Sequence, residues 1–133
     1  MSASKDGLEP HFATKLVHFE AELLKAGIKV IMTQGYRSIA EQNALYAKGR
    51  TAPGNIVTNA PGGASWHNFR RAADYAFVID GNVTWDGPWD KFGHIAQLCG
   101  LEWGGSWTKF RDKPHVQDTG GRTLGQMRKL KLN

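Results

Sequence analysis

The sequence contains a single cysteine, Cys99, among its 133 residues. One cysteine excludes a disulfide bond within the chain, and it excludes a zinc site built from thiolates. Any metal ion bound by this chain must therefore be held by histidine and carboxylate side chains.

Long apolar segments are also missing. No stretch approaches the roughly 20 residues that a helix needs to cross a bilayer. The first six residues, MSASKD, lack the hydrophobic segment of a secretory signal peptide. We therefore expect a protein that is made in the cytosol and has no export signal of its own. The length of 133 residues favours one domain, spanning residues 1–133.

Acidic residues are fewer than basic ones, 12 against 17, which gives a formal net charge of +5. Seven basic residues fall in the last quarter of the chain: Lys109, Arg111, Lys113, Arg122, Arg128, Lys129 and Lys131. This excess predicts affinity for a polyanion, and a solvated basic surface that aids solubility is an equally good interpretation. Motifs for a recognition helix or an aromatic nucleic-acid platform are absent, so nucleic acid is not an expected partner.

Hydrophobic periodicity predicts both helices and strands, and hence an α+β fold. Phe12, Leu16, Phe19 and Leu23 form one stripe of an amphipathic helix that Gly27 ends. Helices are expected at residues 11–26, 39–48 and 88–99, and strands at 28–33, 72–79, 83–85 and 115–117. Residues 50–64 and 101–108 are predicted loops, and residues 120–133 a weakly packed basic tail or short helix.

Two histidines and two carboxylates stand in segments that could meet in the fold. His67 ends a glycine-rich loop, Asp74 lies in a predicted strand, and His115 follows a proline. Three ligands of these types suit a catalytic zinc ion with one open position. Asp74 could equally be a buried hydrogen-bonding residue. Asp112, three residues before His115, could serve as a base beside the metal or be a turn residue.

Five tryptophans are present in this small chain. Trp66, Trp103 and Trp107 lie near the candidate ligands in sequence and could wall a groove for a peptide, although tryptophans in small domains usually pack in the core. We expect Trp107 to line the groove and Trp85 and Trp89 to belong to the core.

These residues resemble a known family. The pattern Ser-x-His-x-x-x-x-Ala-x-Asp is present as Ser65, His67, Ala72 and Asp74, and Asp-x-Pro-His as Asp112, Pro114 and His115. Together with residues 34–38, 41–51 and 100–107, they resemble the zinc-dependent peptidoglycan peptidases, which include D-alanyl-D-alanine carboxypeptidases and phage L-alanyl-D-glutamate endopeptidases. The segments occur in the family's order over nearly the whole chain, and the phage endolysin type is the most similar branch.

The resemblance implies a role for each matching position. His67, Asp74 and His115 would bind Zn²⁺, and Asp112 would act as general base and acid. Arg37 would bind or polarise the substrate carbonyl, and Ser65 would place a hydroxyl near the substrate. The implied fold is an α+β domain with a small antiparallel sheet and flanking helices, like the one shared by D-alanyl-D-alanine peptidases and the hedgehog signalling domain.

Arg70 is a departure from the family pattern, which usually has glycine at this position. If that glycine adopts a positive φ angle, an arginine would strain the loop. Together with Arg71, it could instead form a basic rim for an acidic substrate. Glu102 is a rival to Asp112 as the catalytic carboxylate.

The implied activity is zinc-dependent hydrolysis of the L-alanyl-D-glutamate bond in peptidoglycan stem peptides. The alternatives are a D-alanyl-D-alanine carboxypeptidase or dipeptidase and a non-catalytic cell-wall-binding module. The expected protein is a monomeric, bacteriolytic phage endolysin without a separate wall-binding domain, released from the host cytoplasm by a holin. Its basic tail could contact the anionic envelope.

Overall fold

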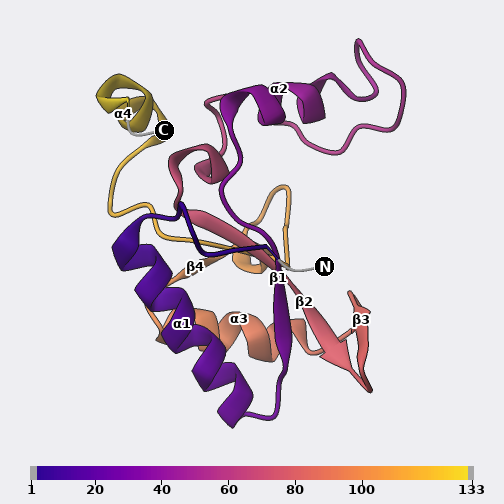
Figure 1. Ribbon diagram of the computed structural model, residues 1–133, viewed down its shortest axis with the longest axis vertical. Helices are drawn as coiled ribbons and strands as arrows, with labels where there is room; N and C mark the ends of the chain where they lie inside the picture. Colours follow the sequence, from indigo (N-terminus) through magenta and orange to yellow (C-terminus); the bar gives the residue numbers. More distant parts are fainter. Residues whose placement is uncertain (1–2, 132–133) are drawn as a thin grey trace.

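The computed structural model describes residues 3–131. It contains four α-helices, two short 3-10 helices and a five-stranded sheet, in the order α1 (Pro10–Lys25), β1 (Val30–Gln34), α2 (Ile39–Ala47), η1 (Trp66–Phe69), β2 (Ala72–Ile79), β3 (Asn82–Thr84), α3 (Trp89–Leu98), β4 (Glu102–Trp103), η2 (Gly104–Ser106), β5 (His115–Gln117) and α4 (Leu124–Leu130). Figure 1 shows α1 and α3 beside the sheet and α2 and α4 beyond one end of it. The predicted α+β class with a small sheet and flanking helices is confirmed.

Strand β2 is the centre of the sheet. All pairings are antiparallel, with strand order β1-β2-β5-β4 and β3 paired to the far end of β2. Asp74 of β2 is the register partner of both His115 of β5 and Gln34 of β1. The sheet therefore brings together residues that are about 40 positions apart in the sequence.

The core lies between one face of β2 and the helices α1 and α3. Tyr75 and Phe77 of β2 make edge contacts with Phe92 of α3, and Phe19 of α1 contacts both Tyr75 and Phe92. Because successive side chains of a strand point to opposite faces, Asp74 faces away from this core. The same strand thus supplies the core on one face and an acidic group on the other.

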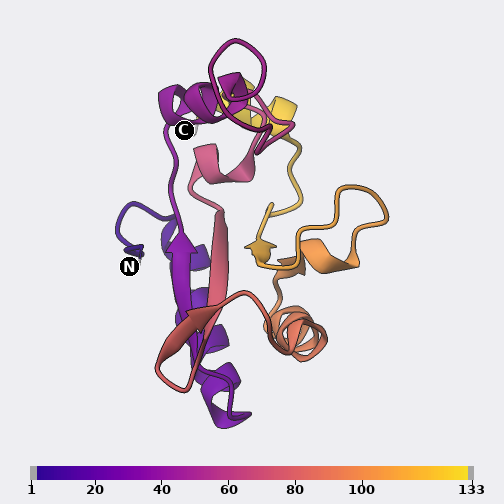
Figure 2. The ribbon, with the colours of Figure 1, turned by 90° about the vertical axis from the view of Figure 1, so that its right-hand side faces the viewer.

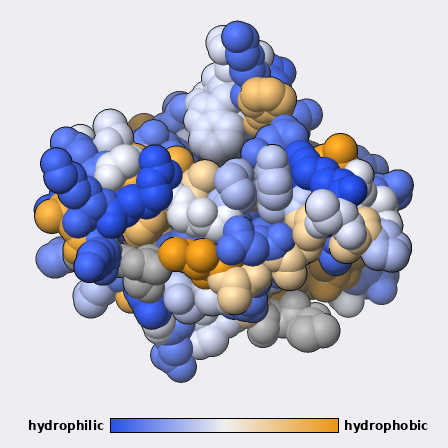
Figure 3. Space-filling model, turned by 90° about the horizontal axis from the view of Figure 1, so that it is seen from above, coloured by the Kyte–Doolittle hydropathy of each residue, from blue (hydrophilic) through white to orange (hydrophobic). Residues whose placement is uncertain are grey.

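A long loop follows α2 and leads into η1. Ser38 and Glu41 form the predicted capping box at the start of α2, and residues 50–64 contain no helix or strand. Figures 1 and 2 place α2, this loop and α4 at one end of the molecule, beyond η1. Seen from above in Figure 3, that end is mainly hydrophilic, with small separate apolar areas.

Some expectations about the elements were wrong. The segment expected to be a glycine and tryptophan loop contains strand β4 and turn η2, because Glu102 and Trp103 pair with β5. Trp85, expected in the core, is 55% exposed beyond the hairpin, whereas Trp89 packs partly buried against the core. Of the two alternatives predicted for residues 120–133, the short helix is present as α4, and Met127, which is 1% exposed, anchors it.

No helix within residues 3–131 combines the length and the apolar character needed to cross a bilayer.

Candidate metal centre

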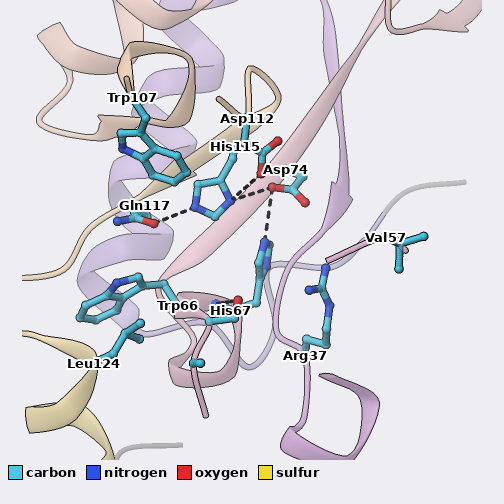
Figure 4. Close-up of a pocket in the computed structure, with 12 residues that line it drawn as sticks. Arg37, Val57, Trp66, His67, Asp74, Trp107, Asp112, His115, Gln117 and Leu124 are labelled. Carbon is cyan, nitrogen blue, oxygen red and sulfur yellow. Dashed lines mark hydrogen bonds and ion pairs between the residues drawn. The ribbon is translucent and has the colours of Figure 1, made fainter. Parts of the chain in front are cut away.

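Three side chains converge on the face of the sheet opposite the core. His67 comes from η1, Asp74 from β2 and His115 from the first position of β5. One ligand atom from each lies within 4.8 Å of the others. Figure 4 shows the two imidazoles pointing at the Asp74 carboxylate from different sides. The structure therefore brings together the three residues that the sequence nominated as metal ligands.

Hydrogen bonds behind the imidazoles fix which nitrogen faces the cluster. His67 Nδ1 lies 2.8 Å from the carbonyl oxygen of Gly35, which can only accept, so Nδ1 carries the hydrogen. His115 Nε2 lies 2.7 Å from Gln117 Oε1 in the same way. The lone pairs of His67 Nε2 and His115 Nδ1 then face Asp74 Oδ1, at 3.3 and 3.0 Å.

Three acceptor atoms directed at one point repel each other unless a cation lies between them. The set of two neutral imidazole nitrogens and one carboxylate oxygen is a common one for zinc. When no metal is bound, a proton takes the place of the cation. Burial would lower the pKa of His115, but its hydrogen bond and charge interaction with Asp74 dominate and raise that pKa. The donor set and its orientation therefore fit a divalent metal ion.

The two carboxylates of the site have pKa values that are displaced in opposite directions. Burial disfavours the charged form of Asp74, yet its contacts with the imidazoles of His115 and His67 hold its pKa well below the usual range. Asp112 Oδ2 lies 3.8 Å from His115 Nδ1, with the Asp112 side chain 48% exposed. Burial and the negative charge of Asp74 raise the pKa of Asp112. One carboxylate is thus suited to remain charged and the other to exchange protons.

Arg37 enters the site from the segment that follows β1. Its Nη1 donates to Gln42 Oε1 at 2.8 Å and its Nη2 to Gln34 Oε1 at 3.3 Å. Its Nε is buried without a hydrogen-bond partner. Burial lowers the pKa of Arg37, while the charges of Asp74, Glu41 and Asp112 oppose that shift. Two neutral glutamine side chains thus hold the Arg37 guanidinium, and its Nε–H makes no hydrogen bond.

A hollow of about 560 Å³ surrounds these groups. All seven site residues nominated from the sequence line it, namely Arg37, Ser65, His67, Asp74, Trp107, Asp112 and His115. Trp66, named from the sequence as a groove candidate, also lines it, and four lining residues were missed, namely Val57, Ala64, Gln117 and Leu124. Gln117 could have been found, because it lies two positions after His115 on a strand and so shares its face.

Ser65 has a local structural role in addition to its place in the hollow. Its hydroxyl accepts a hydrogen bond from the backbone N–H of His67 at 3.2 Å and caps η1. Trp107 lies with its ring centroid 5.3 Å from that of His115, as expected for a residue that lines the site.

One expectation around the site was wrong. Arg70 and Arg71 do not line this hollow, because their guanidinium groups turn toward the carbonyls of Gly7 and Asp118. The position of Arg70 does have a left-handed backbone, with φ of 68°, so arginine occupies a conformation that favours glycine. Glu102 does not line the hollow.

Comparison with known proteins agrees with this site. Two family models, both described as D-alanyl-D-alanine carboxypeptidase, match residues 5–85 and 58–118. The peptidoglycan L-alanyl-D-glutamate endopeptidase CwlK of Bacillus subtilis (strain 168) is 40% identical over 132 residues, covering 87% of this chain and 79% of CwlK. The chain belongs to this peptidase family. The two matched segments together contain every residue of the candidate metal cluster and Asp112.

Solved structures show that the family's fold is present. The Serratia marcescens L-Ala D-Glu endopeptidase ChiX superposes with a TM-score of 0.58 at 24% identity, over 85% of this chain and 81% of ChiX. The D,D-pentapeptidase VanY from a VanB-type resistance cassette, solved as an E175A mutant with Zn(II), gives a TM-score of 0.65 at 13% identity, over 96% of this chain and 82% of VanY. At these identities the likeness establishes the fold.

Proposed function

We propose that this protein is a zinc-dependent peptidoglycan endopeptidase that hydrolyses the L-alanyl-D-glutamate bond of the stem peptide. The observation that carries the proposal is the convergence of His67, Asp74 and His115 on one point, with Asp112 beside it. The 40% identity to CwlK, whose name specifies this bond, supports the choice of substrate.

His67 Nε2, Asp74 Oδ1 and His115 Nδ1 would hold the zinc ion. When bound, zinc supplies Lewis acidity and lowers the pKa of a coordinated water. The carbonyl of Gly35 and the amide of Gln117 keep the two imidazoles in the required tautomers. The charge of Asp74 is secured by its depressed pKa. The chain thus provides a ligand set that is oriented before the metal binds.

Asp112 would be the general base and acid. Its carboxylate would take a proton from the attacking water and deliver that proton to the leaving amine. The pKa of Asp112 is raised, so it lies closer to the working pH than the pKa of an ordinary aspartate. Burial and the charge of Asp74 both favour the protonated form. Its partial exposure gives it access to a substrate in the hollow.

Arg37 would bind the substrate carbonyl and stabilise negative charge as it develops on the oxygen. Arg37 lines the hollow, and Gln42 and Gln34 hold its guanidinium there. Trp107, with Trp66 beside it in Figure 4, would form the wall of a groove for the peptide, and Ser65 would contribute through its place in the hollow.

A D-alanyl-D-alanine carboxypeptidase or dipeptidase is the second candidate, since the matching family models carry that description. Mass spectrometry of digested muropeptides separates the two. The endopeptidase releases peptides that begin with D-glutamate and leaves L-alanine on the muramic acid. The carboxypeptidase releases only terminal D-alanine. A non-catalytic wall-binding module would bind sacculi and create no new amine ends.

Replacement of Asp112 by asparagine tests the mechanism. We expect Asp112→Asn to lower kcat on peptidoglycan by roughly 10²- to 10⁴-fold, the usual contribution of a general base, while the bound zinc measured by atomic absorption stays at one equivalent. Full activity in this variant, or in the wild-type protein after chelation, would contradict the proposal.

The biological role proposed here is that of a monomeric, bacteriolytic phage endolysin that acts on the cell wall after holin-type release. Contact of the basic segment, residues 122–131, with the anionic envelope would assist it. Co-expression with and without a holin in a bacterial host tests the release route. Lysis that does not depend on the holin would exclude this part of the proposal.

A further inference from the structure

A second hollow, separate from the metal centre, is lined by three arginines. Arg70 follows η1, Arg71 precedes β2, and Arg122 precedes α4, and all three border a hollow of about 360 Å³. The rest of its lining is Leu8, Glu9, Pro10, Phe69 and Met127. In Figure 1 this region lies between the start of α1, the η1 turn and α4. Cationic groups thus surround a partly apolar floor.

Two of the arginines are held in place by neutral groups. Arg70 Nη1 donates to the carbonyl of Gly7 at 2.7 Å, and its guanidinium stacks 3.9 Å above the centre of the Tyr36 ring. Arg71 Nη1 donates to the carbonyl of Asp118 at 3.0 Å. Carbonyls and an aromatic ring orient a guanidinium without neutralising its charge. Both guanidinium groups are therefore fixed, and Arg71 also lies 3.8 Å from Glu9.

Opposite charge is scarce around this hollow. Glu9 is the one carboxylate in its lining, 3.8 Å from Arg71, and it already accepts from the Phe12 N–H at 2.8 Å and pairs with His11 at 3.0 Å. The Arg122 side chain is exposed and has no hydrogen bond or ion pair with any residue in the range 3–131. Three arginines and one engaged carboxylate line this hollow, which leaves an excess of positive charge that a ligand anion would neutralise.

Two elements, η1 and α4, contribute residues to both hollows. In η1, His67 faces the metal centre and Phe69 the arginines, and in α4, Leu124 lines the first hollow and Met127 the second. A large polymeric substrate at the metal centre would pass close to the arginine hollow. A small substrate would occupy the first hollow alone.

We propose that Arg70, Arg71 and Arg122 form a binding site for a free carboxylate of peptidoglycan, on a stem peptide other than the one being cleaved. This inference rests on the proposed peptidoglycan substrate. Arginine forks match the two oxygens of a carboxylate, and Phe69, Met127 and Leu8 offer an apolar surface to the aliphatic part of the side chain that bears it. The site would increase affinity for the polymer without taking part in bond cleavage.

Arg122 is the residue to change, because its side chain is exposed and makes no hydrogen bond or ion pair within residues 3–131. Binding of the zinc-loaded protein to purified sacculi is measured by co-sedimentation at 4 °C, with native sacculi and with sacculi whose carboxylates have been converted to amides. We expect Arg122→Ala to raise the apparent Kd for native sacculi roughly tenfold, the loss of one charge-assisted hydrogen bond, and to have no effect on amidated sacculi. Lys29→Ala, an exposed lysine at the opposite end of the sheet, is the control of equal charge and should bind like the wild-type protein.

Three results would overturn the site. These are unchanged binding of Arg122→Ala, equal losses in Arg122→Ala and Lys29→Ala, and stronger competition by soluble poly(glycerol phosphate) than by the free stem tetrapeptide. Release of new amine ends is followed in parallel at 37 °C. Wild-type protein that releases none would overturn the proposed function, whereas normal cleavage with carboxylate-independent binding would overturn only the arginine site.

Discussion

At the scale of single residues, the charged groups of the site depend on neutral amides behind them. Gln117 is buried, and its Oε1 accepts from His115 Nε2 at 2.7 Å, which turns the other ring nitrogen toward Asp74. We expect Gln117→Leu to weaken zinc binding by roughly 10- to 100-fold, because the imidazole loses both its orientation and its tautomer preference. Zinc titration against a chelating dye measures this.

Gln117→Glu is the matched control for that prediction. It retains an acceptor oxygen in the same place, so its affinity for zinc should be no weaker than that of the wild-type protein. If leucine and glutamate at position 117 gave the same affinity, the hydrogen bond to His115 would have no part in metal binding.

Gln42 has the corresponding role behind Arg37. It is fully buried, accepts from Arg37 Nη1 at 2.8 Å and donates to the carbonyl of Ala60 at 2.8 Å. We expect Gln42→Met to lower kcat on peptidoglycan roughly tenfold with little change in KM, because Arg37 loses an anchor. In the Arg37→Ala background the same substitution should have almost no further effect.

Asn43→Ala is the control variant for Gln42→Met. It tests whether the loss of kcat comes only from weaker attachment of the loop that follows α2. Asn43 lies on the same helix and accepts from the Gly62 N–H at 2.8 Å, but no hydrogen bond or ion pair within residues 3–131 joins it to Arg37. We expect Asn43→Ala to lower kcat less than Gln42→Met does. Additive losses from Gln42→Met and Arg37→Ala would refute a positioning role for Gln42.

The residues nominated from the sequence are those whose chemistry is distinctive. Histidines and aspartates in segments of the right spacing could be selected by type, and the structure brings His67, Asp74 and His115 together. Gln42 and Gln117 were not selected, because a neutral amide becomes informative only when its partner across the fold is known. Arg70 was singled out, but the direction of its side chain depends on Gly7 and Tyr36, which no local pattern connects to it.

At the scale of elements, α1 stabilises the sheet from the face opposite the site. Phe19 is fully buried and makes edge contacts with Tyr75 and Phe92, at centroid distances of 5.7 and 5.1 Å. We expect Phe19→Ala to lower the free energy of unfolding by about 3–5 kcal/mol. Val17→Ala, on the exposed side of the same helix at 59% exposure, should change it by less than about 0.5 kcal/mol. Urea unfolding measures both, and similar values would mean that α1 is not held by its apolar stripe.

Elements with a strong local signal were predicted well. The stripe of α1, the Ser38 capping box and the apolar run of β2 each gave bounds within about two residues of the structure. Strand β4 was missed because its two residues are held only by pairing with β5, a long-range contact. Trp85 was misplaced for a similar reason, since its size suggested the core while the hairpin turns it outward.

At the scale of the whole molecule, the candidate metal site joins three separate elements of the fold. His67 belongs to the turn after the long loop, Asp74 to the central strand, and His115 to a strand of three residues. Without a cation, the buried acceptor atoms of these three residues face each other. A metal ion that binds only the folded state therefore stabilises all three segments at once.

Removal of the metal should consequently lower stability as well as activity. At zinc concentrations about 1,000 times Kd, the stabilisation is about 4 kcal/mol, and for a domain of this size its loss corresponds to a fall in Tm of roughly 10 °C or more. Differential scanning calorimetry with zinc and with a chelator measures the shift. His115→Ala, which removes one ligand atom, should show little dependence of Tm on zinc. A wild-type Tm that does not respond to zinc would mean that the cluster is satisfied by protons alone, and the metal-dependent mechanism would fall with it.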